Sequence, residues 1–284
     1  MAESRQQSII EIIRARRSVR TYRPDRIADN LRQYLLNAMQ ELQAGPFGHH
    51  ARFRLLDRRD FSDQRKVFGT YGFIQNAPCF IVGTITNTTG AFEDYGYLLE
   101  RLILMAQKLG LGSCWLGGSF KRNRYAKLLD LKENEVIPAV TPVGYPAEKP
   151  ALRDKLIRLG AGSKNRKPRQ ELFFENTFHQ PLNDEAAGKY STALEMVRLA
   201  PSASNRQPWR VVKINNRYHF YLQRTPGYGR LLPEIDLQKV DIGIALCHFE
   251  LSAGELALKG HWQCTDPEIP LPENCEYILS WIVD

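Results

Sequence analysis

An internal repeat is the feature that most limits how this 284-residue chain can fold. Residues 94–115 align without a gap on residues 241–262, at an offset of 147 positions. The identical pairs include the Asp-x-Gly that opens each copy and the Trp that closes it: Asp94/Asp241, Gly96/Gly243, Leu99/Leu246, Leu104/Leu251, Ala106/Ala253, Leu109/Leu256, Leu111/Leu258 and Trp115/Trp262. Apolar residues recur at helical spacing, so each copy predicts a long buried helix. Two unrelated buried helices sharing Leu and Ala by chance are the weaker alternative.

The remaining pattern predicts a similar order of elements around each copy. We expect helices at residues 9–16, 27–42 and 186–199, and strands at residues 53–57, 80–86, 136–143, 210–215, 218–223 and 277–283. This order predicts an α+β protein of two pseudo-symmetric halves, each with a mainly antiparallel sheet packed around long apolar helices. We place the halves at residues 1–160 and 161–284, with a linker at Gly160 to Pro168 that is rich in Gly, Lys and Arg.

Composition excludes several classes of protein. Hydrophobic content of 43% and charged content of 25% are ordinary for a globular chain, and no apolar run is long enough for a membrane span. Five cysteines without a CxxC spacing argue against a disulfide framework or a zinc site, and no signal-peptide pattern opens the chain, so we expect a cytoplasmic protein. The net charge of +8 suits a phosphate-bearing cofactor about as well as nucleic acid, and we expect no nucleic-acid or membrane partner.

Two polar strings carry recognisable chemistry. Arg16-Arg17-Ser18-Val19-Arg20 offers guanidinium groups and a hydroxyl, which bind phosphate through charge-assisted hydrogen bonds; a basic helix C-terminus is the alternative. In the string Ala200 to Trp209, Pro201 and Pro208 restrict the backbone and small side chains leave room for a flat ring. The amides there add donors and acceptors, and an ordinary polar loop with a core Trp is the alternative. The residues concerned are Ser202, Ala203, Ser204, Asn205 and Gln207.

Together, "RRSVR" and "PSASNRQPW" resemble the nitroreductase family of FMN-dependent oxidoreductases, and the resemblance covers nearly the whole chain. Such proteins are usually intertwined homodimers with FMN at the subunit interface. The resemblance therefore implies a nitroreductase-like fold in which one internally duplicated chain, as a monomer, acts as a pseudo-dimer. Further self-association stays open.

The resemblance also implies roles for individual residues. Arg16, Ser18 and Arg20 would contact the flavin phosphate and pyrimidine side, with Arg17 acting mainly through its backbone. Gly117 and Gly118, in the glycine-rich loop at residues 110–120, would face the N5 edge of the flavin, where the chemistry occurs; a glycine C-cap and turn is the alternative. Arg153 and Lys155 would add a second basic pair on the phosphate. The remaining cofactor contacts would come from Pro201, Ser202, Ala203, Ser204, Asn205 and Gln207.

The opposite combination of half-sites looks degraded. Arg166-Lys167-Pro168-Arg169 occupies the place of RRSVR, with Pro168 where the Ser hydroxyl should be. Gly45 to Phe53 stands where the ring loop should be, and it has neither Asn nor Gln. His49 and His50 lack neighbouring ligand residues and predict no metal site. We therefore predict one complete site, built from the phosphate grip of the first half and the ring loop of the second.

The function implied is an FMN-dependent NAD(P)H oxidoreductase, a flavoprotein of nitroreductase type. NADH or NADPH would reduce the flavin, and a small organic electron acceptor, such as a nitroaromatic or a quinone, would reoxidise it. No GxGxxG or P-loop string is present, so no separate nucleotide-binding domain is expected. The alternative is a flavin-binding carrier, sensor or degenerate scaffold without turnover.

Overall fold

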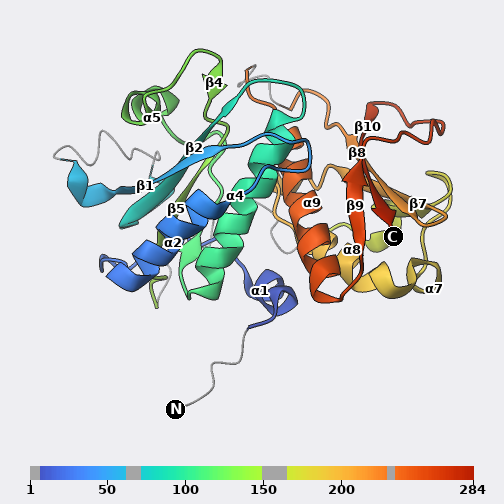
Figure 1. Ribbon diagram of the computed structural model, residues 1–284, viewed down its shortest axis with the longest axis horizontal. Helices are drawn as coiled ribbons and strands as arrows, with labels where there is room; N and C mark the ends of the chain where they lie inside the picture. The colour runs from blue at the N-terminus through green and yellow to red at the C-terminus, as the bar shows by residue number, and fades with distance from the viewer. Residues whose placement is uncertain (1–6, 62–71, 149–164, 229–233) are drawn as a thin grey trace.

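Two halves lie side by side, and a pair of long helices runs between them (Figure 1). The computed structural model describes residues 7–61, 72–148, 165–228 and 234–284. The central helices are α4 (Ala91–Lys108) and α9 (Leu237–Glu255), the two copies of the repeat. Asp236 begins α9 as its N-cap by accepting hydrogen bonds from the backbone N–H groups of Gln238 and Lys239, both at 3.1 Å.

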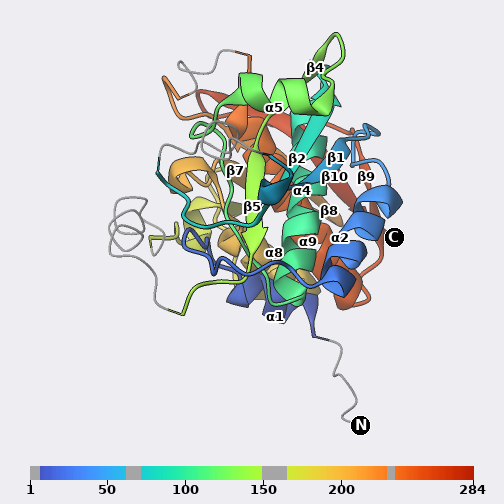
Figure 2. The same ribbon diagram turned by 90° about the vertical axis from the view of Figure 1, so that its left-hand side faces the viewer.

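The first half is an antiparallel sheet with helices packed against it (Figure 2). Its strands follow the order β1-β2-β5-β3, and β4 pairs with the far end of β2. The strands are β1 (Arg52–Asp57), β2 (Cys79–Thr86), β3 (Gly112–Ser113), β4 (Glu135–Val136) and β5 (Val140–Gly144). Its helices, besides α4, are α1 (Ile9–Ala15), α2 (Asp29–Glu41) and α5 (Arg122–Leu129).

The second half repeats this order as β7-β8-β10-β9 and adds β6 beside β7 in the parallel direction. The strands are β6 (Phe173–Glu175), β7 (Trp209–Ile214), β8 (Arg217–Gln223), β9 (Gly260–Gln263) and β10 (Cys275–Val283). Its short helices are α7 (Asp184–Ala187) and α8 (Ser191–Leu199). The matching strand orders confirm the predicted α+β fold with two pseudo-symmetric halves.

Glycines bring the two central helices into unusually close contact. A Cβ on Gly96 would lie 2.1 Å from the carbonyl oxygen of Val240, and a Cβ on Gly243 would lie 1.8 Å from that of Glu93. These two contacts are related by the same offset of 147 positions, since Gly96 matches Gly243 and Glu93 matches Val240. The repeated glycine therefore lets backbone touch backbone where the halves meet.

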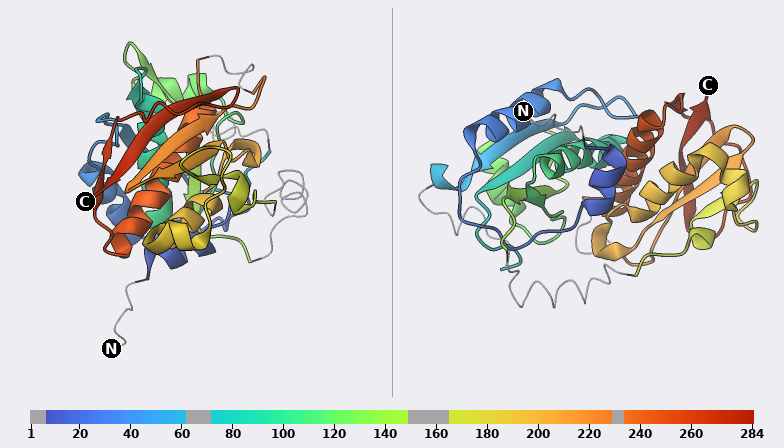
Figure 3. Two further views of the ribbon diagram at one scale, coloured as in Figure 1. Left: turned by 90° about the vertical axis from the view of Figure 1, so that its right-hand side faces the viewer. Right: turned by 90° about the horizontal axis from the view of Figure 1, so that it is seen from below.

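The cores of the two halves are not separated along the chain. Ile12 and Ile13 of α1 are buried in the same apolar cluster as the helices and sheet of the second half. Seen from below, α1 lies at the junction of the halves beside α9 (Figure 3, right). The N-terminal helix thus belongs to the first half in sequence and packs into the core of the second. The boundary at residue 160 stays a prediction, because residues 149–164 are outside the described part of the chain.

The structure corrects three predicted elements. The strand expected at residues 136–143 is two strands, because Pro138 has no N–H for a ladder and the pairing with β2 shifts by one residue there. The helix expected at residues 186–199 is divided by Gly188, whose φ of 53° is not helical. Both repeated helices end before the matched tryptophans, so Trp262 lies in β9. Helix α5 was not predicted.

The other predicted helices and strands form within two residues of their expected ends. The hairpin expected at Asn215 and Asn216 joins β7 to β8, and Asn215 adopts a φ of 52°, a left-handed conformation that Asn tolerates. None of the helices within the described ranges combines the length and apolar character that crossing a bilayer requires.

Candidate functional site

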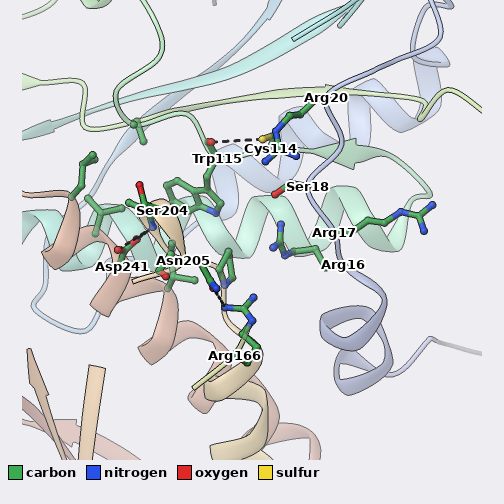
Figure 4. A pocket seen from close by; sticks show the side chains of 18 residues that line it. Arg16, Arg17, Ser18, Arg20, Cys114, Trp115, Arg166, Ser204, Asn205 and Asp241 are labelled. Atoms are coloured by element: carbon green, nitrogen blue, oxygen red, sulfur yellow. Dashed lines mark hydrogen bonds between the residues drawn. The ribbon is translucent and has the colours of Figure 1, made fainter. Parts of the chain in front are cut away.

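A cavity of about 290 Å³ lies between the halves, and both halves line it (Figure 4). The first half contributes Arg16, Arg17, Ser18, Arg20, Cys114, Trp115, Gly117 and Ala139. The second half contributes Arg166, Pro201, Ser202, Ala203, Ser204, Asn205, Leu237, Val240, Asp241 and Ile244. The structure therefore brings together the two strings that the sequence analysis singled out, although about 180 positions separate them.

Positive charge gathers at one end of this cavity. The Arg16 side chain is only 6% exposed, and its Nη1 is buried without a hydrogen-bond partner in the described part of the chain. Ser18 is held beside β3, because the next residue, Val19, donates its N–H to the Ser113 carbonyl at 2.8 Å. The side chain of Arg17 is exposed and extends away from the other labelled residues (Figure 4).

A buried network holds Arg16 and Trp115 in place. Glu100, on α4, accepts a hydrogen bond from Trp115 Nε1 at 2.7 Å, contacts His248 Nε2 at 2.9 Å and lies 3.8 Å from Arg16 Nε. His248, on α9, also contacts the Met196 carbonyl oxygen through Nδ1 at 2.9 Å. Both Glu100 and His248 are fully buried. The network therefore joins the two halves directly behind the cavity.

The proton count of this network determines its charge. A carbonyl oxygen only accepts, so His248 Nδ1 must carry a proton, and a hydrogen bond between Nε2 and Glu100 needs a second one. With these two protons, the pair of His248 and Glu100 is neutral as a unit, whichever group holds the shared proton. The positive charge of Arg16 is therefore not cancelled by the pair and remains available to an anion.

The ring loop at residues 201–207 is held in a fixed and unusual shape. Ser204, Asn205 and Gln207 have φ values of 49°, 53° and 49°, in the left-handed region that most residues avoid. Ser202 Oγ accepts the Gln207 N–H at 2.9 Å, and both carboxylate oxygens of Asp241 accept the Ala203 N–H, at 2.9 and 3.1 Å. Strained backbone of this kind persists where the surroundings over-determine it, which is common at ligand sites.

Arg166 corrects the expected layout. The sequence analysis assigned it to the opposite, degraded site, but its side chain lies in the same cavity as Arg16. Its Nη1 donates to the Ala200 carbonyl at 2.6 Å and to Asn205 Oδ1 at 3.0 Å, and its Nη2 donates to the Leu199 carbonyl at 3.0 Å. Burial, together with the nearby charge of Arg16, lowers the pKa of Arg166 to about 10. The second half thus supplies a cation to this site as well as the ring loop.

The segment that carries Arg166 is tied to the ring loop by side-chain amides. Gln207 accepts the Lys167 N–H at 2.9 Å and donates to the Asn165 carbonyl at 3.3 Å, and Asn205 Nδ2 donates to the same carbonyl at 2.9 Å. Gln207 is buried and does not line the cavity, so its amide positions the loop from behind. This differs from the ligand contact that the resemblance implied for it.

The other predicted site residues divide into three groups. Gly117 lines the cavity, and a Cβ there would lie 2.8 Å from the Leu237 side chain. Gly118 is exposed and is not part of the cavity wall. Arg153 and Lys155 lie outside the described residues.

An apolar wall completes the cavity, and the sequence analysis did not assign it. Leu237, Val240 and Ile244 face the cavity from the first two turns of α9. Their helical spacing, next to the Asp-x-Gly of the repeat, was the signal available in the sequence. One end of the cavity therefore carries positive charge, and the other combines an apolar helix face with Asp241.

At the pseudo-equivalent position of the other half, side chains occupy the space. Phe47 lies so close to the N-cap of α4 that a Cβ on Gly90 would lie 2.7 Å from its ring. A Cβ on Gly45 would lie 2.3 Å from the Asp94 carboxylate. Phe47 also packs against the core of the second half. A flat ring has no room here without movement of Phe47.

Comparison with known proteins assigns the fold and the family. The family model described as "Putative TM nitroreductase" matches residues 8–253. The crystal structure of a "putative nitroreductase" from Thermotoga maritima MSB8 superposes with a TM-score of 0.64 and 18% sequence identity, covering 100% of this chain and 97% of that one. Because the family model spans most of the sequence, this chain belongs to that nitroreductase family.

Two curated relatives each match about half of the chain. A protein of Methanothermobacter thermautotrophicus described as "Putative NADH dehydrogenase/NAD(P)H nitroreductase" is 27% identical over 158 residues, which is 51% of this chain and 81% of the relative. A protein of Archaeoglobus fulgidus with the same description is 26% identical over 151 residues, 49% of this chain and 86% of the relative. Relatives of about half this length agree with a chain of two similar halves.

Proposed function

We propose that this protein is an FMN-dependent NAD(P)H oxidoreductase that reduces a small organic acceptor. The observation that carries the proposal is the cavity between the halves, which has buried cations at one end and an apolar helix face at the other. A flavin mononucleotide has the matching division into an anionic phosphate and a flat, largely apolar ring. The names of the two curated relatives support the same activity class.

The residues present fit this cofactor. Arg16 has a buried Nη1 without a partner among the described residues, and its charge is not cancelled by the pair behind it, so it suits a phosphate. Ser18 and Arg166 lie in the same cavity and would add a hydroxyl and a second guanidinium. Small side chains in the ring loop leave space beside the apolar wall of α9 for a ring.

Each part of the site would have a separate task. The bound flavin would accept hydride from NADH or NADPH and pass reducing equivalents to the acceptor. Arg16, Ser18 and Arg166 would bind and orient the phosphate, and Leu237, Val240 and Ile244 would exclude water from one side of the ring. Cationic side chains near the ring would stabilise negative charge on the reduced cofactor.

We also propose that one chain is the functional unit. The two halves supply different parts of one site, as the two subunits of a homodimer would. An ancestral duplication followed by loss of one site explains both the repeated helix and Phe47 in the opposite position.

Absorbance spectroscopy tests the proposal directly. Protein mixed with FMN should bind it at micromolar concentration, and anaerobic NADH or NADPH should bleach the flavin band. A quinone or nitroaromatic should then restore the band, with ping-pong kinetics in steady state. Binding without bleaching would favour a carrier or sensor, and absence of flavin binding would refute the proposal.

A further inference from the structure

Asp241 has hydrogen-bonding capacity that the protein does not use. It is only 3% exposed and lines the cavity, and among the described residues its partner is a single N–H, from Ala203. Its counterpart Asp94 is also buried, but it accepts the N–H of Phe47, the N–H of His49 and a contact from His49 Nδ1, at 2.8–2.9 Å. Asp94 does not line the cavity. The repeat thus places one saturated and one unsaturated carboxyl at matching positions.

The surroundings of Asp241 favour its neutral form. Burial raises the pKa of Asp241 well above its usual range, the negative charge of Asp236 raises it further, and the Ala203 N–H opposes this only in part. The hydroxyl of Tyr228 also faces it, and the pKa of that phenol is raised, mainly by burial. The arginines of the cavity lie away from Asp241 in the close view (Figure 4). A neutral carboxyl carries an O–H, which needs an acceptor when it is buried.

We propose that Asp241 donates its carboxyl O–H to an acceptor atom on the ring of the bound flavin. The inference rests on the proposed function, because the flavin is the ligand that would supply the acceptor. Flavin rings present carbonyl oxygens and ring nitrogens, and the side of Asp241 away from Ala203 is the cavity. In this role Asp241 serves two purposes, since it also anchors the ring loop through Ala203.

The proposal fixes the sign of a pH effect. While Asp241 is protonated, its O–H stabilises bound flavin and the negative charge that reduction adds to the ring. As the pH rises through the raised pKa, the donor is lost and a carboxylate faces the ring. Flavin affinity should therefore fall with increasing pH, and the midpoint potential of the bound flavin should fall more steeply than that of free flavin.

Asp241→Asn is the informative variant. Asn keeps an oxygen for the Ala203 N–H and offers an N–H donor to the ring, but it does not ionise. Asp94→Asn is the matched control, because burial also raises the pKa of Asp94 although Asp94 does not line the cavity. Dissociation constants for FMN and riboflavin should be measured by fluorescence between about pH 5 and about pH 9, the range in which a raised carboxyl pKa titrates. Riboflavin is needed because the second pKa of a phosphate lies at about 6.

The expected result is a loss of at least about tenfold in riboflavin affinity with rising pH, for the intact protein and for Asp94→Asn, equal to about 1.4 kcal/mol. Asp241→Asn should show a flat profile and no added slope in its midpoint potential. A flat profile for the intact protein, or a parallel decline in Asp241→Asn, would overturn the inference. Should Asp241→Asn not fold, Asp241→Ser keeps an O–H donor without a charge and is expected to be flat as well. No flavin binding by the intact protein at any pH would instead remove the proposed function.

Discussion

A buried arginine beside a buried glutamate usually forms a closed ion pair, but Arg16 is in a different position. Glu100 shares a proton with His248 and also accepts the indole N–H of Trp115, so little of its charge is left for Arg16. Arg16 keeps its positive charge in a buried place, at 3.8 Å from Glu100. Such an arrangement costs stability without a ligand and strengthens the binding of an anion.

Replacing Arg16 by alanine should therefore reduce FMN affinity by about ten- to hundredfold, since hydrogen bonds to charged groups contribute about 1.5–3 kcal/mol. Riboflavin, which has no phosphate, should bind to Arg16→Ala almost as it does to the intact protein. Arg17→Ala is the control, because that side chain is exposed and extends away from the cavity. Fluorescence titrations with both flavins measure the effect. Equal losses for FMN and riboflavin would show that Arg16 does not hold the phosphate.

A second residue, far from the cavity, predicts how the protein responds to acid. His219 is buried on β8, contacts Ser280 Oγ at 2.7 Å and has its pKa lowered to about 4 by burial. The unfolded chain binds the proton more readily, so stability is present above the ordinary pKa of about 6.5 and is lost as the pH falls toward 4.

Acidification from about pH 6.5 to about pH 5 should cost about 2 kcal/mol through His219, at 1.36 kcal/mol per pKa unit. Urea unfolding of His219→Gln should show less of this loss, whereas His50→Gln, at an exposed position, should behave like the intact protein. The same acid sensitivity in His219→Gln would assign the loss to other groups.

At the scale of elements, the crossing of α4 and α9 sets the geometry of the site. The glycines at the crossing let the helices touch through their backbones, and this contact places the first turns of α9 beside Trp115 and the phosphate grip. The same stretch of each helix carries the aspartate that holds a neighbouring loop. Asp94 holds residues 47–49 and Asp241 holds Ala203. Helix packing and loop placement are therefore coupled through the Asp-x-Gly string.

Gly243→Ala should disrupt this crossing. The added methyl would lie 1.8 Å from the Glu93 carbonyl oxygen and 2.7 Å from the Tyr97 nitrogen, and neither backbone atom can rotate away. We expect a destabilisation of at least about 3 kcal/mol, at the upper end for overpacked positions. Gly254→Ala in the same helix has no heavy atom within 4 Å of the new Cβ and should be neutral or stabilising by up to about 1 kcal/mol. Thermal melts compare the two, and similar melting temperatures would contradict the close crossing.

At the scale of the whole molecule, two similar halves produce one site. The cations Arg16 and Arg166 come from different halves but converge on the same cavity, and the pseudo-equivalent position holds the Phe47 ring. A homodimer cannot make this choice, because identical subunits carry identical site residues. A single chain with two copies of the fold can concentrate its binding groups on one side.

Stoichiometry tests this asymmetry. We expect one FMN per 284-residue chain, because the opposite position offers Phe47 in place of a small side chain and has lost Arg166 to the first cavity. Loss of two or three polar contacts at about 1 kcal/mol each lowers affinity by roughly a hundredfold. Asn205→Ala combined with Arg16→Ala should abolish binding, whereas His50→Ala should leave it intact. Titration to two equivalent flavins per chain would contradict the asymmetry and leave the family assignment untouched.

Local patterns determined much of this protein. Helical spacing of apolar residues predicted both central helices, and the Asn-Asn pair at residues 215–216 predicted a hairpin, because these signals act between residues that are neighbours along the chain. The two polar strings predicted residues that now lie in one cavity. The repeat predicted two halves, and the matching strand orders confirm them.

Only the tertiary structure decided which groups face the cavity. Arg166 and Gln207 look alike in sequence as polar residues near a motif, yet one lines the cavity and the other ties the loop from behind. Likewise, the two aspartates of the repeat are identical in sequence, but only Asp241 borders the cavity. Whether a side chain meets a ligand or the protein depends on contacts between segments far apart in the chain, and a one-dimensional pattern does not contain those distances.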